Sequence, residues 1–404
     1  MNPFFKNKTA ASTNLAALLA SLILIPAAIL VVAGEMRQAV PLLVGVTAVM
    51  TISLSCILYV GERGRLAWSP AAILLVALLL RLLFLFAPPQ LSDDVYRYLW
   101  DGSNLIAGIN PYATAPSKMI PSPALSPVHS RINHPDYVTI YPPMAQITFG
   151  GGTALDGTIT ALKAFLTLID IGLCALLIAL LKKFEMPVWK SVLYVWNPLP
   201  IIEIAGSGHV DGAGMALVLA ALYLLLQDGK TSGEGASRNV PFLISGALLA
   251  CAGLVKLLPF VFAPALLLLV TSGKRRYFIA GCIGTVALLA IPFLPDLINM
   301  TSSLDSYARN REFAGFAFTV LRAVTGSGAL ARLLLSASFL LIVCIITYRL
   351  AQRVKQIELS DSRALPAVKA CYITAAVFLA PLIEYSSAKF SGLFSLIDTS
   401  EHQS

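Results

Sequence analysis

The sequence predicts an all-α polytopic membrane protein, in which a bundle of apolar helices spans the bilayer. Of its 404 residues, 57% are hydrophobic and only 12% are charged, whereas soluble domains carry about 25% charged residues. The mean hydropathy is +0.79. The apolar residues also form blocks long enough to cross a hydrocarbon core about 30 Å thick, which takes about 20 helical residues. These observations exclude a water-soluble globule.

The apolar blocks predict a bundle of about eleven transmembrane helices. Two weaker stretches, 143–155 and 313–324, are expected to be re-entrant or interfacial. No internal repeat or soluble domain is evident, so residues 1–404 are interpreted as a single integral membrane domain with a polar C-terminal tail at 384–404. The blocks lie at 14–33, 40–60, 71–87, 159–181, 191–205, 212–226, 241–255, 259–272, 277–294, 329–350 and 366–383.

The distribution of basic residues predicts a cytoplasmic N-terminus. With that orientation, sixteen Lys and Arg residues fall in inner segments and nine in outer segments, as the positive-inside rule requires. The net charge of +8 is therefore explained by the orientation of the chain in the membrane and implies no nucleic-acid partner. The six cysteines all lie in apolar blocks without a CxxC pair, which indicates neither a disulfide framework nor a zinc site.

The largest extramembrane segment, 88–157, is expected on the outer side as a large first catalytic loop. Two prolines end the third span, and Ser92 can cap a short helix that begins DDVYRYLWDG. Its tyrosines and tryptophan suit an interfacial position at headgroup level. At 3.6 residues per turn, Asp94, Tyr98 and Asp101 share one face, and Asp93, Arg97 and Trp100 share the next.

The two adjacent acids of this helix are candidates for general-base catalysis. A carboxylate can accept a proton from a hydroxyl when partial burial raises its pKa from about 4 toward working pH. Because adjacent side chains diverge, one of Asp93 and Asp94 is expected to meet the hydroxyl while the other caps, orients or binds a divalent cation. The structural alternative is an acidic first turn favoured by the helix dipole, with Asp93 and Arg97 as an i,i+4 ion pair.

A second outer feature is the run WNPLPIIEIAGSGHVDGAG at residues 196–214. A proline-interrupted span carrying Glu203 ends there in a glycine-rich turn that presents His209 and Asp211. With no second histidine nearby, a metal site is only weakly indicated. Hydrogen bonding to a polar substrate is the preferred interpretation, and a helix-joining turn with polar caps is the alternative.

Cationic and aromatic side chains at the same level are further binding candidates. Lys256 ends the seventh span, where its ammonium can neutralise a lipid phosphate or extend to the headgroups. Arg309 and Arg311 are alternative phosphate partners, because the guanidinium fork suits phosphate oxygens. Tyr141 lies in the proline-rich stretch 110–143, where an aromatic ring can form a sugar platform or belong to the interfacial belt.

Three charged residues lie deep within the apolar blocks. Lys163 and Asp170 are two helical turns apart on one face and are interpreted as a structural ion pair, because a paired charge costs less than a lone one. Arg81 lies mid-span, with Glu203 as a distant candidate partner. Charges at such depth are also functional candidates, and they favour the alternative of a secondary transporter with a midplane path.

Six runs occur in an order that is similar to a known enzyme family: SDDVYRYLWDG, AGINPY, YPPMAQ, WNPL, GSGHVDG and VKLLP. The chain resembles the GT-C fold glycosyltransferases over about residues 70–325, specifically the polyprenyl-phosphate-mannose-dependent enzymes of glycosyltransferase family 87. The resemblance implies an acidic catalytic base in the first outer loop, which is Asp93 or Asp94 here. It also implies a sugar cavity lined by the Glu203 and 209–211 region, and a donor phosphate at Lys256.

The resemblance implies an enzyme that transfers a hexose, with mannose preferred, from a polyprenyl-phosphate-linked donor. A lipid or glycan hydroxyl at the outer face of the cytoplasmic membrane would accept the sugar, with inversion of the anomer. No cofactor is clearly indicated, and a divalent cation is left open. Because 384–404 lacks the family's late histidine-proline-aromatic motif, a catalytically silent relative that binds lipid-linked sugar is another alternative. The residues expected to bind substrate are Arg97, Tyr98, Asp101, Tyr141, Glu203, His209, Asp211, Lys256, Arg309 and Arg311.

Overall fold

The chain is helical throughout the part that the structure describes. The computed structural model describes residues 3–34, 36–64, 68–89, 91–226, 239–310 and 316–358, which contain helices and turns but no β-strand. The span expected at 366–383 and the polar tail lie outside these residues. The helices are α1 (Pro3–Val32), α2 (Val40–Glu62), α3 (Pro70–Leu85), α4 (Asp94–Ile106), α5 (Ser126–His129), α6 (Pro143–Asp156), α7 (Ile159–Lys183), α8 (Val192–Val195), α9 (Pro198–Pro200), α10 (Asp211–Leu225), α11 (Val240–Val255), α12 (Ala263–Leu269), α13 (Arg275–Ala290), α14 (Ile298–Asn310), α15 (Phe316–Thr325) and α16 (Gly328–Glu358), with a π-helical turn at Ile201–Gly206 and short 3₁₀ segments between several of them.

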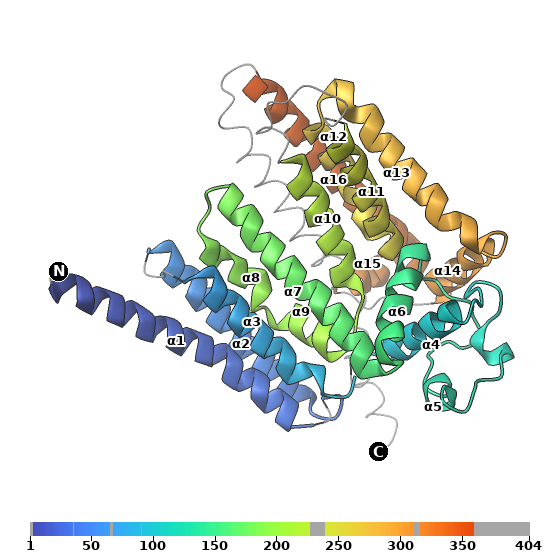
Figure 1. The fold of residues 1–404 in the computed structure, drawn as a ribbon, viewed down its shortest axis with the longest axis horizontal. Coiled ribbons are helices and arrows are strands. Elements are labelled where there is room, and N and C mark those ends of the chain that lie inside the picture. Colours follow the sequence, from blue (N-terminus) through green and yellow to red (C-terminus); the bar gives the residue numbers. More distant parts are fainter. Residues whose placement is uncertain are drawn as a thin grey trace.

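The long helices pack side by side across the bundle. Helices α1, α3, α7, α10, α11 and α13 follow one another, and each packs against the next (Figure 1). Helices α4, α5, α6 and α14 gather at one end of this row, where α3 and α11 finish and α7 and α10 begin. We call this the site end. The segment between α3 and α7 covers the site end, because α6 packs on α4, α7 and α11.

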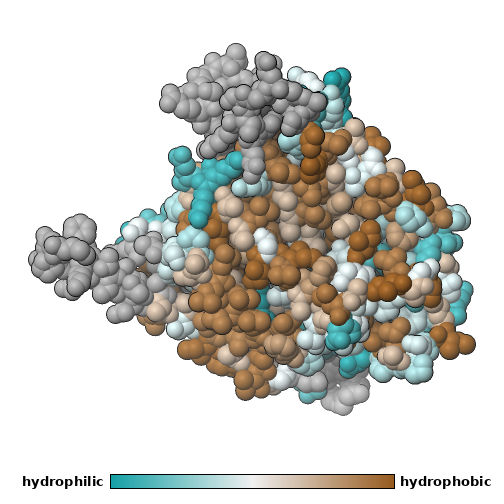
Figure 2. Space-filling model, viewed as in Figure 1, coloured by the Kyte–Doolittle hydropathy of each residue, from teal (hydrophilic) through white to brown (hydrophobic). Residues whose placement is uncertain are grey.

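Several helices meet the length and composition of a membrane span. Counting within the described residues gives four spans, or five if the two parts of a broken helix, bent by 117°, are one span. Other apolar helices, such as α3 and α11, are shorter than this criterion requires, so the count of about eleven stays a prediction. Figure 2 shows apolar side chains across much of the helical face. The qualifying segments are Val40–Glu62, Ile159–Lys183, Ser272–Phe293 and Gly328–Arg349, with Pro198–Gly206 and Asp211–Leu225 as the broken pair.

Two glycines let α11 and α13 pack with their backbones in contact. A Cβ on Gly246 would lie 1.9 Å from the carbonyl oxygen of Phe278, and a Cβ on Gly281 would lie 2.0 Å from that of Leu243. Small residues at such crossings allow the close approach that stabilises helix pairs in a bilayer. The contact holds α11 in place, and Lys256 follows directly at the site end of that helix.

Arg81 and Asp170 form a closed ion pair inside the helical bundle. The Arg81 Nε lies 2.6 Å from Asp170 Oδ2, and both side chains are fully buried. Arg81 also donates to the carbonyl oxygen of Val195 at 2.9 Å, while the Tyr194 hydroxyl donates to the other carboxylate oxygen at 2.6 Å. The pair joins α3, α7 and α8, so Arg81 has a structural role and Glu203 is not its partner.

The predicted ion pair between Lys163 and Asp170 is wrong. The Lys163 ammonium instead donates to the carbonyl oxygens of Phe84 and Ala87, at 3.1 and 2.5 Å. These carbonyls lie at the C-terminal end of α3, where a helix has no partners of its own for its last oxygens and favours a positive charge. Lys163 therefore stabilises the end of α3, from which the chain continues into the acidic segment.

Candidate functional site

Helix α4 begins at the site end of the bundle, with Asp94 of the acidic pair as its first residue. Asp93 is its N-cap residue, and the Ser92 hydroxyl accepts a hydrogen bond from the Asp94 N–H at 3.3 Å. The rings of Tyr98 and Trp100 are packed inside the protein, at 1% and 3% exposed. They are buried because α5 and α6 cover α4, and this covering could not be read from the helix alone.

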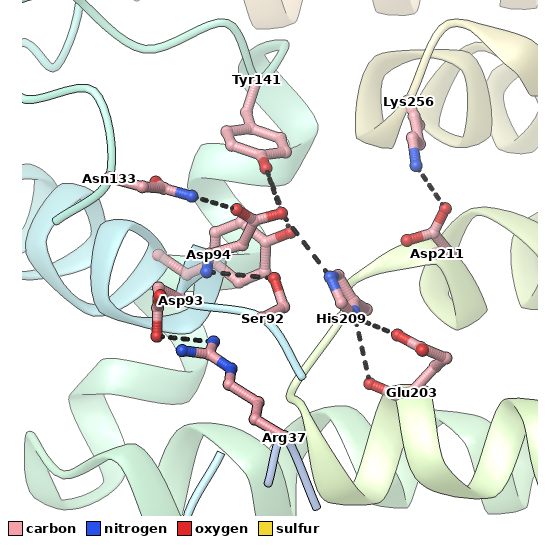
Figure 3. A network of polar contacts seen from close by, with 11 residues as sticks. Arg37, Ser92, Asp93, Asp94, Asn133, Tyr141, Glu203, His209, Asp211 and Lys256 are labelled. Atoms are coloured by element: carbon pink, nitrogen blue, oxygen red, sulfur yellow. Dashed lines mark hydrogen bonds and ion pairs between the residues drawn. The ribbon is translucent and has the colours of Figure 1, made fainter. Parts of the chain in front are cut away.

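Asp94 faces a cluster of polar side chains contributed by two other segments, the connection between α5 and α6 and the turn before α10 (Figure 3). Its Oδ1 accepts a hydrogen bond from the Asn133 amide at 2.7 Å, and its Oδ2 accepts one from the Tyr141 hydroxyl at 3.3 Å. The His209 Nε2 lies 3.5 Å from the same Oδ2. The Asp94 side chain remains 31% exposed. It is therefore a carboxylate that is held in place and still accessible.

Asp93 points away from this cluster and has a different partner. The Arg37 guanidinium, in the connection between α1 and α2, lies 3.1 Å from Asp93 Oδ1, and both side chains are about two-fifths exposed, at 42% and 41%. The structural alternative of an i,i+4 ion pair between Asp93 and Arg97 is wrong, because Arg97 pairs with Asp101 at 2.8 Å. The structure thus separates the two adjacent acids into different surroundings.

Tyr141 is held over Asp94 by the aromatic interior of the segment. Its ring packs edge-on against Tyr98 and Phe149, and the Tyr98 hydroxyl donates to the Tyr141 hydroxyl at 3.2 Å. Burial raises the pKa of Tyr98 well above its usual value, so this hydroxyl stays protonated and remains a donor. Tyr112 adds a hydrogen bond to the Tyr141 carbonyl at 2.7 Å. These contacts hold the Tyr141 hydroxyl in position beside Asp94.

The broken helix before α10 presents His209 to the site. The π-helical turn Ile201–Gly206 is followed by a turn in which Gly208 adopts φ +78°. A side chain at Gly208 would be strained and would place its Cβ 2.8 Å from a methyl of Val95 on α4. The glycine lets the turn approach α4, and the predicted helix-to-helix turn therefore brings His209 against Asp94.

Glu203 lies on the other side of His209. One Glu203 carboxylate oxygen is 2.7 Å from His209 Nδ1, and the Glu203 carbonyl accepts from the His209 backbone N–H at 3.0 Å. Both side chains are about nine-tenths buried, at 9% and 10% exposed. The imidazole consequently lies between two carboxylates, a nearly buried one and the accessible Asp94.

Lys256 and Asp211 form an ion pair beside this cluster. The Lys256 ammonium lies 2.5 Å from Asp211 Oδ1, and each side chain is 39% exposed. Asp211 is the first residue of α10, where a negative charge is favoured by the helix dipole. The pair reaches the same end of the bundle as Asp94 and presents a partly exposed cation there (Figure 3).

The other predicted substrate residues lie deeper or outside the described residues. Arg97 and Asp101 are 6% and 1% exposed, and Arg97 also donates to the Tyr137 carbonyl at 3.0 Å, so they support α4 from behind. Burial raises the pKa of Asp101, against the opposing effect of Arg97. The side chain of Arg309 and all of Arg311 lie outside the described part of the chain.

Two contacts of the acidic pair were not predicted from the sequence. Asn133 and Arg37 reach Asp94 and Asp93 from 39 and 56 residues away, and no local pattern marks either one. Within the described residues, no group of three or more His, Cys, Asp and Glu side chains could hold a metal ion. The question of a divalent cation, left open from the sequence, stays open.

Comparison with known proteins identifies the family of this chain. Residues 9–272 match the family model MptA_B_family, described as alpha-(1->6)-mannopyranosyltransferase, N-terminal domain. The matched range includes Asp94, His209 and Lys256. No curated protein matches the chain, and no solved structure matches it. The resemblance to GT-C mannosyltransferases is confirmed by a match over more than half of the sequence, and the chain belongs to the alpha-(1->6)-mannopyranosyltransferase family.

Proposed function

We propose that this chain transfers mannose from a polyprenyl-phosphate-linked donor to a hydroxyl of a lipid or glycan acceptor, with Asp94 as the general base. Membership of a mannosyltransferase family supports the reaction class. Asp94 is proposed as the base because of its exposure and its contacts. Its carboxylate is accessible and accepts hydrogen bonds from Asn133 and Tyr141, which orient it before reaction. Asp93 is held by Arg37 instead.

The reaction we propose is a single displacement. Asp94 takes the proton of the acceptor hydroxyl while that oxygen attacks the anomeric carbon, and the bond from this carbon to the phosphate oxygen breaks. Lys256 is the described cation best placed for the departing phosphate, because its ammonium is partly exposed at the site end and a positive charge stabilises the negative charge that develops there. A single displacement inverts the anomeric configuration.

The transporter alternative has less support from the described residues. It depends on charged side chains that line a midplane path. Arg81 and Asp170 are instead fully buried and saturated by hydrogen bonds, and Lys163 is bound to the end of α3. The accessible polar groups named above gather at one end of the bundle. That arrangement supports chemistry at one membrane face better than passage across the membrane.

The position of the site relative to the membrane is part of the proposal. We place the site end on the outer face of the cell membrane and the N-terminus in the cytoplasm, because sixteen basic residues against nine favour that orientation. A cysteine at the exposed Ser122, between α4 and α6, should react with a membrane-impermeant maleimide added outside intact cells. Labelling only after the cells are broken would contradict this orientation.

A direct test compares the two adjacent acids. Membranes carrying the protein are incubated with radiolabelled polyprenyl-phosphate-mannose, and transfer is compared for wild type, Asp94→Asn and Asp93→Asn. We expect Asp94→Asn to lower kcat by about 10²- to 10⁴-fold, which is the usual share of a general base. Asp93→Asn should retain most activity. Equal rates for wild type and Asp94→Asn would show that another group is the base.

A further inference from the structure

The His209 imidazole lies between the carboxylates of Asp94 and Glu203. Its Nε2 lies 3.5 Å from Asp94 Oδ2, and its Nδ1 lies 2.7 Å from a Glu203 carboxylate oxygen. Three titratable side chains from two separate segments thus form one line that leads from the accessible carboxylate into the nearly buried interior (Figure 3). The resemblance to GT-C glycosyltransferases implied only that the region of Glu203 and His209 lines the sugar cavity.

The contacts of Glu203 determine which nitrogen of His209 carries the proton and which one faces Asp94. Near Nδ1 lie a carboxylate oxygen of Glu203, at 2.7 Å, and the Glu203 backbone carbonyl oxygen, at 3.3 Å. An ionised carboxylate and a carbonyl can only accept hydrogen bonds, so the proton belongs on Nδ1. In the neutral ring, Nε2 is then the acceptor, and it points toward Asp94.

We propose that His209 and Glu203 form a proton relay behind Asp94, rather than a part of the sugar-binding surface. This inference rests on the proposed function. When the acceptor oxygen bonds to the anomeric carbon, its proton moves to Asp94, and the bonding electrons of the leaving group remain on the phosphate. The proton then passes from Asp94 Oδ2 to His209 Nε2, which yields an imidazolium between two carboxylates and restores the Asp94 carboxylate. His209 later releases the proton to water.

The burial of the pair suits this role better than sugar binding. His209 and Glu203 are about nine-tenths buried, at 9% and 10% exposed, whereas Asp94 is 31% exposed. A sugar can therefore reach Asp94 more easily than it can reach the two groups behind it. The negative Glu203 stabilises the positive imidazolium in the low dielectric of the interior. The distance of 3.5 Å to Asp94 is long, but such contacts often tighten when substrate binds.

The relay predicts a specific kinetic result for His209→Ala. We expect kcat to fall by about 10²-fold, with the KM for the lipid-linked mannose unchanged within about twofold, because the group acts on proton transfer and not on binding. Added imidazole should restore part of the lost rate by occupying the vacated space. The matched control is His129→Ala, another histidine of the site end, whose Nε2 lies 2.9 Å from the carbonyl oxygen of Pro116 and whose ring packs on Trp100. That variant should keep its rate and show no response to imidazole.

A second variant tests the relay where His209→Ala fails to fold. Glu203→Gln keeps the size of the side chain but can turn its amide N–H toward Nδ1, which moves the histidine proton to Nε2. Replacing the orienting acid of such a triad by its amide is known to be severe because of the wrong tautomer. We expect Glu203→Gln to lower kcat by at least about 10²-fold with KM unchanged.

Each result supports or contradicts the relay. A raised KM with an unchanged kcat in both variants would assign His209 and Glu203 to sugar binding and overturn the inference. So would a Glu203→Gln variant with the wild-type rate, or a folded His209→Ala variant that imidazole does not activate. A wild-type protein that transfers no mannose would instead contradict the proposed function and remove the relay with it, so the two failures are distinguishable.

Discussion

Asp170 and Asp94 make a direct comparison between the interior of the bundle and its site end. Each carboxylate contacts a nitrogen group and a tyrosine hydroxyl. Asp170 meets Arg81 and Tyr194 at 2.6 Å each, with no exposed surface. Asp94 meets Asn133 at 2.7 Å, meets Tyr141 and His209 at 3.3 and 3.5 Å, and is 31% exposed. Similar groups are therefore inaccessible and structural in the interior of the bundle, and accessible at its site end.

The difference teaches that access, rather than the type of residue, separates a structural charge from a candidate catalytic one. A carboxylate saturated by short contacts in a dry interior cannot exchange a proton with a substrate, because none can reach it. A carboxylate with an exposed edge, such as Asp94, can exchange a proton with a substrate. The same comparison applies within α4, where Asp101 is buried while Asp94, two turns earlier, is accessible.

The largest effect on stability is expected from removing one partner of the buried ion pair between Arg81 and Asp170. Arg81→Met leaves the buried Asp170 without its cation, so the free energy of unfolding should fall by about 3–5 kcal/mol. Thermal denaturation in detergent measures it. The double variant Arg81→Met/Asp170→Leu should recover most of the loss, because a buried pair can be replaced by apolar side chains of similar volume. A single variant as stable as wild type would show that the pair is not structural.

Asp101 gives a smaller, pH-dependent effect. Burial raises its pKa in the folded protein, so the folded state holds this proton more tightly than the unfolded chain, where the pKa is about 4. The stabilisation is present below the unfolded pKa and is lost as pH rises through the raised folded pKa. Relative to Asp101→Asn, wild type should lose stability over that window. A stability difference that is constant across pH would contradict it.

Tyr141→Phe tests the open cluster by removing one donor to Asp94. A hydrogen bond of this kind contributes about 0.5–1.5 kcal/mol, so we expect kcat for mannose transfer to fall by about 2- to 10-fold. The matched control is Tyr194→Phe, which removes the equivalent hydroxyl from Asp170. That change should lower the melting temperature and leave the kcat of the folded protein unaltered. A Tyr141→Phe variant that lost only stability, together with a Tyr194→Phe variant that lost kcat, would contradict the comparison.

The smallest effect is expected at the exposed pair of Arg37 and Asp93. Both side chains are about two-fifths exposed, at 42% and 41%, and such surface pairs contribute only about 0–1 kcal/mol. Arg37→Gln should therefore change the free energy of unfolding by less than about 1 kcal/mol, and added salt should reduce the difference further. A loss as large as that of Arg81→Met would mean that Arg37 has a structural role.

Some of the site could be predicted because its signals are local. The acidic pair follows a double proline, and the turn with Gly208 and His209 is marked by its glycines. The contacts that distinguish Asp94 from Asp93 could not be predicted in the same way. Asn133 and Arg37 come from distant segments, and the side chains of adjacent helical residues diverge by about 100°, so the helix pattern alone leaves both acids as candidates.

The sequence by itself determined the helical membrane class and the order of the family's runs, because apolar block length and residue order are properties of the chain alone. Only the tertiary structure decided the charge pairing. Arg81 meets Asp170 across 89 residues, while Lys163, seven residues from Asp170, binds the end of α3 instead. The physical reason is that a buried charge pairs with whichever partner packing places nearest, and for Arg81 and Lys163 that partner lies on a neighbouring helix or at its end.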